Sequence, residues 1–180
     1  MTIIEAKNKL REYFEEACKV LGVDYESIRF VYEHIGERFK TVGNTCETDG
    51  NILFINEDWI AETLRVDFLY DLQYQMYHEA RHFYQGMVIN DYHRRGKSCE
   101  LPASIHKWEQ EFENYVRNEG TEDSQKANAT QSVEIDANAF ANVMLSIKGF
   151  HQARAPKEQW KETEKRMREI SYTLKCKMNF

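Results

Sequence analysis

Residues 67–89 read DFLYDLQYQMYHEARHFYQGMVI, and this stretch predicts an amphipathic helix. Its apolar residues recur three or four positions apart, which matches one face of an α-helix. We therefore expect a helix with one face packed against a core. The apolar stripe consists of Leu69, Leu72, Met76, Ala80, Phe83 and Met87.

The same helix contains a complete HExxH motif, His78-Glu79-Ala80-Arg81-His82. Two histidines four positions apart share a helix face, because four residues advance about 400° around the axis. Their imidazoles can bind one zinc ion, and Glu79 beside them can reach a zinc-bound water instead of the ion. The motif therefore predicts metal-assisted peptide hydrolysis, with Glu79 as the general base.

A catalytic zinc site needs a third protein ligand. The best candidate lies in a second predicted helix, residues 132–147, which contains the sequence EIDANAFA from Glu134 onward. Glu134 and Asn138 are four positions apart and so point to the same side. We expect Glu134 to bind zinc and Asn138 to orient a ligand histidine by a hydrogen bond.

Small residues in this second helix indicate that it can approach the HExxH helix closely. Ala137 and Ala141 follow Glu134 at helical spacing. If Glu134 were not the ligand, other carboxylates would have to supply it, and the alternatives are Asp136, Asp91 and Glu100.

The remaining sequence predicts an α+β fold, with a small antiparallel sheet of about three strands on a mostly helical body. Strands rich in β-branched and aromatic residues alternate with turn residues between positions 27 and 56, as hairpins do. The predicted strands span residues 27–33, 39–42 and 52–55. Further helices are expected over residues 3–21, 103–118 and 156–176, and a polar loop over 119–130.

Composition excludes several classes of protein. The chain has 180 residues, the size of one domain, and a net charge of -6, which disfavours a nucleic-acid partner. Its four cysteines form no CxxC pair, as expected of reduced cytosolic thiols. No apolar run approaches the roughly 20 residues of a membrane span, and the N-terminus has no secretory signal pattern. We expect a cytoplasmic protein without a membrane or nucleic-acid partner. Its oligomeric state stays open.

HEARH followed by EIDANAFA resembles the gluzincin pattern HExxH…ExxANxFA of the ImmA/IrrE-type minimal zinc metallopeptidases. These proteins occur in bacteria, mobile elements and phages. The resemblance implies a zincin-like fold, in which a short antiparallel sheet precedes the HExxH helix and a following helix supplies a glutamate. It implies that His78, His82 and Glu134 bind Zn²⁺ and that Glu79 is the general base.

His82 and Glu134 are 52 positions apart, which is longer than the family pattern. We interpret the chain as one zincin-like domain, residues 1–180, with an inserted helix and loops at about 90–131. The leading hypothesis is a zinc metallopeptidase that acts on a protein or peptide, such as a regulatory protein. The alternative is a regulatory binding module that keeps the zincin shape and uses the 90–131 region to contact a partner. A weaker third hypothesis is a metal-free helical protein.

Peptide hydrolysis also needs a donor that stabilises the developing oxyanion. The sequence does not single one out, although Tyr92, His93 and Arg94 follow the HExxH helix closely. The strand at 52–55 is a candidate edge for pairing with an extended substrate.

Overall fold

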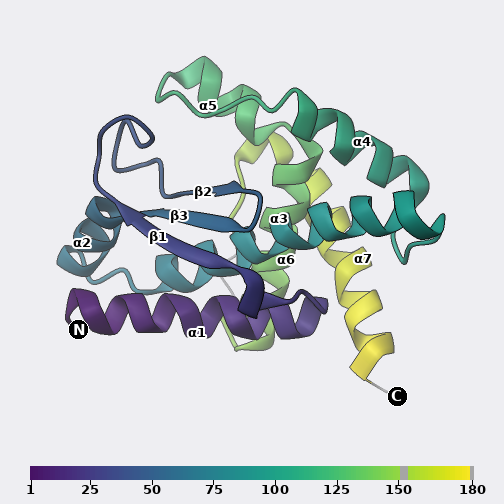
Figure 1. Ribbon diagram of the computed structural model, residues 1–180, viewed down its shortest axis with the longest axis horizontal. Helices are drawn as coiled ribbons and strands as arrows, with labels where there is room; N and C mark the ends of the chain where they lie inside the picture. Colours follow the sequence, from purple (N-terminus) through teal and green to yellow (C-terminus); the bar gives the residue numbers. More distant parts are fainter. Residues whose placement is uncertain (151–153, 179–180) are drawn as a thin grey trace.

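The computed structural model describes residues 1–150 and 154–178, and within them the α+β prediction is confirmed. Helices dominate, and a small sheet lies in the first third of the chain (Figure 1). The elements are α1 (Ile3–Leu21), a 3₁₀ turn η1 (Tyr25–Ser27), β1 (Arg29–Glu33), β2 (Cys46–Asp49), β3 (Ile52–Asn56), α2 (Glu57–Arg65), α3 (Tyr70–Arg95), α4 (Pro102–Glu113), α5 (Glu122–Ala129), α6 (Ser132–Ile147), a second 3₁₀ turn η2 (Lys157–Gln159) and α7 (Trp160–Met178).

Helix α3 is the central element. It is 26 residues long and packs against α1, against α6 and, more lightly, against α4. Helix α7 packs on α6, and α1 runs beneath the sheet (Figure 1). Phe14 of α1, Tyr77 of α3 and Phe140 of α6 are almost fully buried in the core between them. Burial of such aromatic side chains is a main source of stability in a core of this size.

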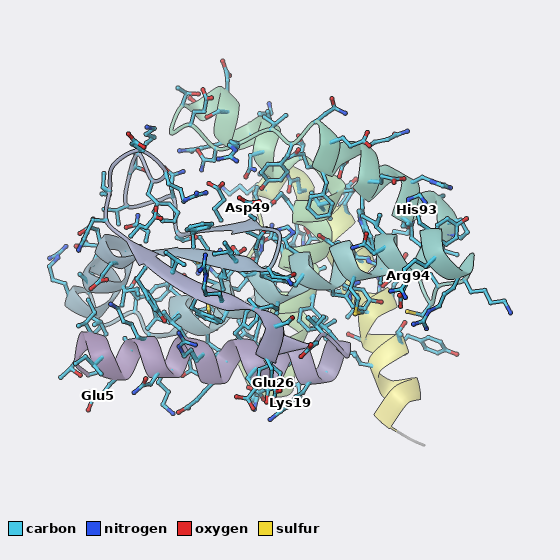
Figure 2. The ribbon with its side chains drawn as sticks, in the orientation of Figure 1. Glu5, Lys19, Glu26, Asp49, His93 and Arg94 are labelled. Carbon is cyan, nitrogen blue, oxygen red and sulfur yellow. The ribbon has the colours of Figure 1, made fainter. Side chains whose placement is uncertain are left out.

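The sheet is mixed, so the prediction of an antiparallel sheet was wrong. Its strand order is β1-β3-β2, in which β1 runs parallel to the central β3. Only the β2–β3 pair is an antiparallel hairpin within the described residues, and Asp49 marks its turn (Figure 2). Gly50 at that turn has a φ of +56°, a backbone conformation that glycine adopts without strain.

The second strand was also misplaced, because residues 39–42 form a loop rather than a strand. The side chain of Asn44 accepts hydrogen bonds from the backbone amides of Lys40 and Thr41. Asn56 donates to the backbone carbonyls of Thr41 and Asn44. These side chains take up backbone groups that a strand ladder would otherwise use.

Helix α5 lies in the segment that the sequence predicts to be a loop, so this expectation was wrong too. Thr121 and Ser124 form a reciprocal capping box at its N-terminus. Its residues are polar on all sides, and none is buried, which is why periodicity gave no signal. Within residues 1–150 and 154–178, no helix has the length and apolar character needed to cross a membrane.

Candidate metal centre

Helices α3 and α6 bring His78, His82 and Glu134 together. The ligating atoms of the three side chains lie within 4.8 Å of one another, a group that could hold a metal ion. Their exposed fractions are 7%, 8% and 6%, so the group is buried. The two histidines come from successive turns of α3, and the glutamate comes from the first turn of α6.

The distances within the triad fit a tetrahedral metal ion. His78 Nε2 and His82 Nε2 are 3.0 Å apart, and each lies 3.3 Å from one oxygen of Glu134. Ligand atoms held at about 2.0–2.1 Å around a tetrahedral ion are about 3.3–3.4 Å from each other. The two histidines approach different oxygens of Glu134, and these spacings are close to those around a tetrahedral metal ion.

The outer ring nitrogens of both histidines face side-chain oxygens. His78 Nδ1 lies 2.9 Å from Asn138 Oδ1, and His82 Nδ1 lies 2.9 Å from Gln85 Oε1. Those oxygens accept, so each Nδ1 carries a proton, and each ring presents the lone pair of its Nε2 to the centre when that ring is neutral. Two lone pairs and a carboxylate that point at one another form an acceptor set that suits a cation.

The third candidate ligand, Glu134, also has a partner, Tyr115, which the sequence did not reveal. Its hydroxyl donates to Glu134 Oε1 at 2.6 Å. Burial, together with the nearby charge of Glu134, raises the pKa of Tyr115, so the phenol stays protonated and can donate. Tyr115 follows α4 and has no regular spacing from the motif residues, so no sequence pattern points to it.

The electrostatics of the metal-free triad are those of an ion pair. Burial alone lowers the pKa of His82, but the charge and hydrogen bond of Glu134 outweigh it and raise that pKa to about 9. Burial alone would raise the pKa of Glu134. The charges and hydrogen bonds of His82 and His78 outweigh this effect, so the pKa lies well below its ordinary value. In the absence of metal, a proton on His82 balances the glutamate charge.

Glu79 lies beside the triad and lines the same cavity. Its side chain is buried, with 4% exposed, and its Oε1 accepts a hydrogen bond of 2.7 Å from Gln75, one turn earlier on α3. Glu79 is not one of the three residues whose ligating atoms converge.

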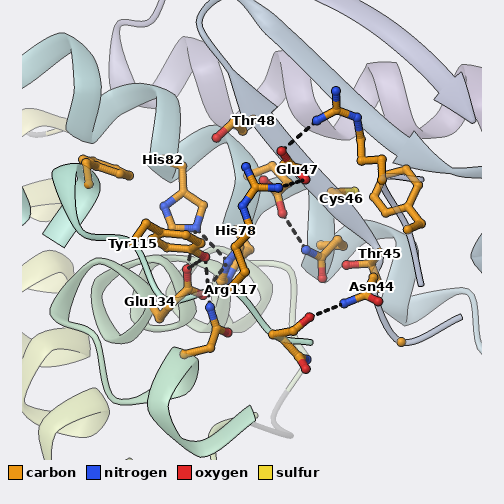
Figure 3. A pocket seen from close by; sticks show the side chains of 18 of the residues that line it. Asn44, Thr45, Cys46, Glu47, Thr48, His78, His82, Tyr115, Arg117 and Glu134 are labelled. Atoms are coloured by element: carbon orange, nitrogen blue, oxygen red, sulfur yellow. Dashed lines mark hydrogen bonds and ion pairs between the residues drawn. The ribbon is translucent and has the colours of Figure 1, made fainter. Parts of the chain in front are cut away.

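A cavity of about 500 Å³ opens onto the triad (Figure 3). One wall is the outer edge of β2 with the loop before it, and the opposite wall is the segment between α4 and α5, residues 114–121, which we call the strap. Two contacts join the walls. Asn44 donates to the backbone carbonyl of Asn118 at 2.8 Å, and Arg117 pairs with Glu47 at 2.9 Å.

Several candidates from the sequence lie elsewhere. Residues 92–94 are at the C-terminal end of α3 and do not line the cavity, and Figure 2 shows His93 and Arg94 at that end. His93 contacts Glu109 of α4 instead. Strand β3 is central, so the edge that faces the cavity belongs to β2.

The alternative third ligands are also engaged elsewhere. Asp136 and Glu100 form ion pairs with Arg81 and Arg166. Asp91 lies 3.8 Å from Arg95, one turn later on α3. None of the three belongs to the group of converging ligand atoms in the described residues.

Fold and site together define a mostly helical α+β protein with a buried His-His-Glu group suited to a metal ion. Comparison of the chain with protein-family models, curated proteins and solved structures gave no match.

Proposed function

We propose that the protein is a zinc-dependent metallopeptidase. The observation that carries the proposal is the convergence of His78, His82 and Glu134 on one point at the base of a cavity, with Glu79 beside them. The resemblance of HEARH and EIDANAFA to the ImmA/IrrE-type pattern supports the same reading. Zinc suits two imidazoles and a carboxylate, because catalytic zinc sites commonly have three such ligands and one open position.

A zinc ion at this position would lower the pKa of a water molecule and polarise a substrate carbonyl. The chain itself supplies the proton transfer. Gln75 holds one oxygen of Glu79, and we assign the other, Oε2, to take a proton from water and pass it to the leaving amine. We also assign to Tyr115 the stabilisation of negative charge on the substrate oxygen, for which its phenol must leave Glu134 Oε1 and turn its single proton toward the substrate.

The substrate in this proposal is an extended protein or peptide chain. Cys46, Glu47 and Thr48 of β2 line the cavity, and β2 is an edge strand. An edge strand has unpaired backbone groups that can pair with an extended chain. A substrate paired with β2 would lie across the mouth of the metal centre.

The decisive experiment is Glu79→Gln in the zinc-loaded protein. We expect cleavage of a proteome-derived peptide library, read by mass spectrometry, to fall by about 10²–10⁴-fold, which is the range for loss of a general base. Zinc stoichiometry should be unchanged, because Glu79 is not a ligand. A matched control is Glu113→Gln, which removes another carboxylate from the cavity wall and should retain activity. Full activity in Glu79→Gln would contradict the assignment.

A second candidate is a zincin-shaped binding module that cleaves nothing unaided. The observation that favours it is the strap, which is tied to the opposite wall of the cavity by Asn118 and Arg117. Stoichiometric zinc with no cleavage of the peptide library, even after the strap is loosened by Arg117→Ala, would favour this candidate over the enzyme.

A further inference from the structure

Four charged side chains form a cluster, two of them buried and two partly exposed, on the side of α3 away from the cavity. Arg81 and Arg166 are its cations, and Glu100 and Asp136 are its anions; we call these four residues the charge cluster. Each arginine bonds to both carboxylates, Arg81 at 2.8 and 2.9 Å and Arg166 at 2.6 and 2.7 Å. The cluster joins three helices and the loop before α4, because Arg81 is on α3, Asp136 on α6 and Arg166 on α7.

One side chain links the charge cluster to the metal centre. Gln85 is fully buried on α3, and its Nε2 donates to Asp136 Oδ2 at 2.7 Å and to the backbone carbonyl of Val133 at 3.0 Å. Both amide protons are therefore used by the α6 side. Its oxygen then faces His82 Nδ1 at 2.9 Å. A flipped amide would put its oxygen against two other oxygens, so the orientation of Gln85 is set by Asp136 and Val133.

Folding must remove the charges of this cluster from water, which costs free energy. Arg81 and Asp136 are only 3% and 2% exposed, and taking such charges out of water costs several kcal/mol for each ion. Two cations and two anions balance, and the arginine forks satisfy both carboxylates. Apolar residues of similar volume could stabilise the core as well as such ion pairs do. The contact that they could not replace is the one from Asp136 to Gln85.

We propose that the charge cluster positions His82 through Gln85, so that the metal affinity of the site depends on the docking of α7. The proposal rests on the proposed function only in that the triad binds zinc. Arg166 is the contribution of α7. It donates to Oδ1 of Asp136, whereas Gln85 donates to Oδ2, and Asp136 in turn fixes the amide whose oxygen accepts from His82 Nδ1. Arg166 and Gln85 are thus positioning residues.

The other histidine provides an internal reference. His78 is held by Asn138, whose oxygen also accepts from the hydroxyl of Tyr74. These contacts involve no member of the charge cluster. A disturbance that travels through Gln85 should therefore alter His82 and leave His78 unchanged, whereas general loosening of the fold would alter both.

The test is the zinc affinity of Arg166→Met, measured by competition with a chromogenic chelator, together with NMR signals of the two histidine rings in the zinc-bound protein. We expect affinity to fall by at least about tenfold, the lower end of the range for loss of groups behind metal ligands. The ring signals of His82 should shift and those of His78 should not. The control is Arg168→Met on the same helix, whose exposed side chain pairs with Glu164 of α7 itself, and it should match the parent.

If Arg166→Met does not fold, Gln85→Met tests the same proposal. It removes the amide that links Asp136 to His82 and leaves the four charged residues in place. It should weaken zinc binding by about 10–100-fold. Arg166→Lys should restore part of the affinity, since a lysine can pair with one of the two carboxylates. Zinc affinity within about twofold of the parent in these variants, or equal shifts at both histidines, would overturn the positioning role. A parent chain that binds no zinc would overturn the proposed function itself.

Discussion

At the scale of single residues, each candidate ligand is held from behind by one polar side chain. Asn138 faces His78, Gln85 faces His82 and Tyr115 faces Glu134. Such contacts fix the tautomer of a histidine and the orientation of a carboxylate. The centre is therefore preorganised, and its geometry depends on groups that would not touch the metal.

Tyr115→Phe should weaken zinc binding by about tenfold, because it removes the 2.6 Å hydrogen bond that orients Glu134. Chelator competition measures the change. Thermal stability should stay close to that of the parent, since the ring is retained. Tyr172→Phe, at an exposed position on α7, serves as the control. Unchanged affinity in Tyr115→Phe would show that Glu134 holds its orientation without the phenol.

Zinc binding near neutral pH should release about one proton. The pKa of His82 in the metal-free protein is raised to about 9 by Glu134 against the opposing effect of burial, so His82 is protonated there and must lose that proton to bind zinc. Apparent affinity should rise with pH until about 9. Calorimetry in buffers of different ionisation enthalpy measures the release, and a heat independent of buffer would contradict it.

The same pKa predicts how the stability of the metal-free protein depends on pH. The folded-state pKa lies above the ordinary value of 6.5, so the stabilisation from the His82–Glu134 pair is fully present below about pH 6.5. It is lost as pH rises through about 9. Denaturant unfolding across this range, with His82→Gln as the comparison, should show a fall in the free energy of unfolding in the parent alone.

The motif residues could be predicted from sequence because helical spacing alone places them on a shared face. His78 and His82 are one turn apart, as are Glu134 and Asn138. Tyr115 and Arg166 could not be predicted, since their contacts depend on how a loop and a distant helix pack. The periodicity of a sequence describes one helix or strand at a time and carries no information about contacts between distant elements.

At the scale of elements, the position of Glu134 depends on how closely α6 approaches α3. Ala137 and Ala141 are fully buried on α6, as the sequence suggested for a close pair of helices. Ala141 lies two turns after Glu134, on the same face of the helix. Small side chains there let the ligand carboxylate reach the histidines.

Ala141→Leu should destabilise the fold by about 1–3 kcal/mol and weaken zinc binding, because extra methyl groups force the two helices apart. Denaturant unfolding and chelator competition measure the two effects. Ala61→Leu, at an exposed position of α2, should change stability by less than about 0.5 kcal/mol. A stable Ala141→Leu variant with parental zinc affinity would mean that α6 can shift without moving Glu134.

Helices with apolar stripes could be predicted at this scale, and the sheet order could not. Helix α6 was expected at its observed bounds, whereas α3 was expected over residues 67–89 and continues to Arg95. The order β1-β3-β2 arises because Asn44 and Asn56 hold residues 40–44 as a loop that carries the chain past β3. Hydrogen bonds between side chains and backbone of this kind leave no periodic trace in a sequence.

At the scale of the whole molecule, access to the candidate metal centre lies between the β2 edge and the strap. Tyr115 joins the strap to the triad, and Gln131 of the α5–α6 connection accepts from the backbone amide of Val116. The strap is thus anchored on the helical side by several bonds. On the β2 side it is held by the pairs Asn44–Asn118 and Glu47–Arg117.

Arg117→Ala should speed the removal of zinc by a chelator several-fold and leave the equilibrium affinity unchanged, because it loosens the strap without touching a ligand. Stopped-flow capture by a chromogenic chelator measures the rate. Added salt should have a similar effect on the parent, since Arg117 is exposed and its ion pair is screened. Lys126→Ala, on the exposed face of α5, is the control. Equal rates in parent and Arg117→Ala would show that the strap does not limit access.

The two contacts on the β2 side also set the fraction of molecules in which the strap is released from the β2 wall. An exposed ion pair is worth about 0–1 kcal/mol, and a neutral hydrogen bond adds about 0.5–1.5 kcal/mol. The two ranges add to about 0.5–2.5 kcal/mol, and a mid-range total of about 1.5 kcal/mol corresponds to a ratio of roughly 13 between the two states. About one molecule in ten would then be unlatched at any moment in the metal-free, unliganded protein. A molecule that enters the cavity would not need to force it open, because it could bind the open state that thermal motion already populates.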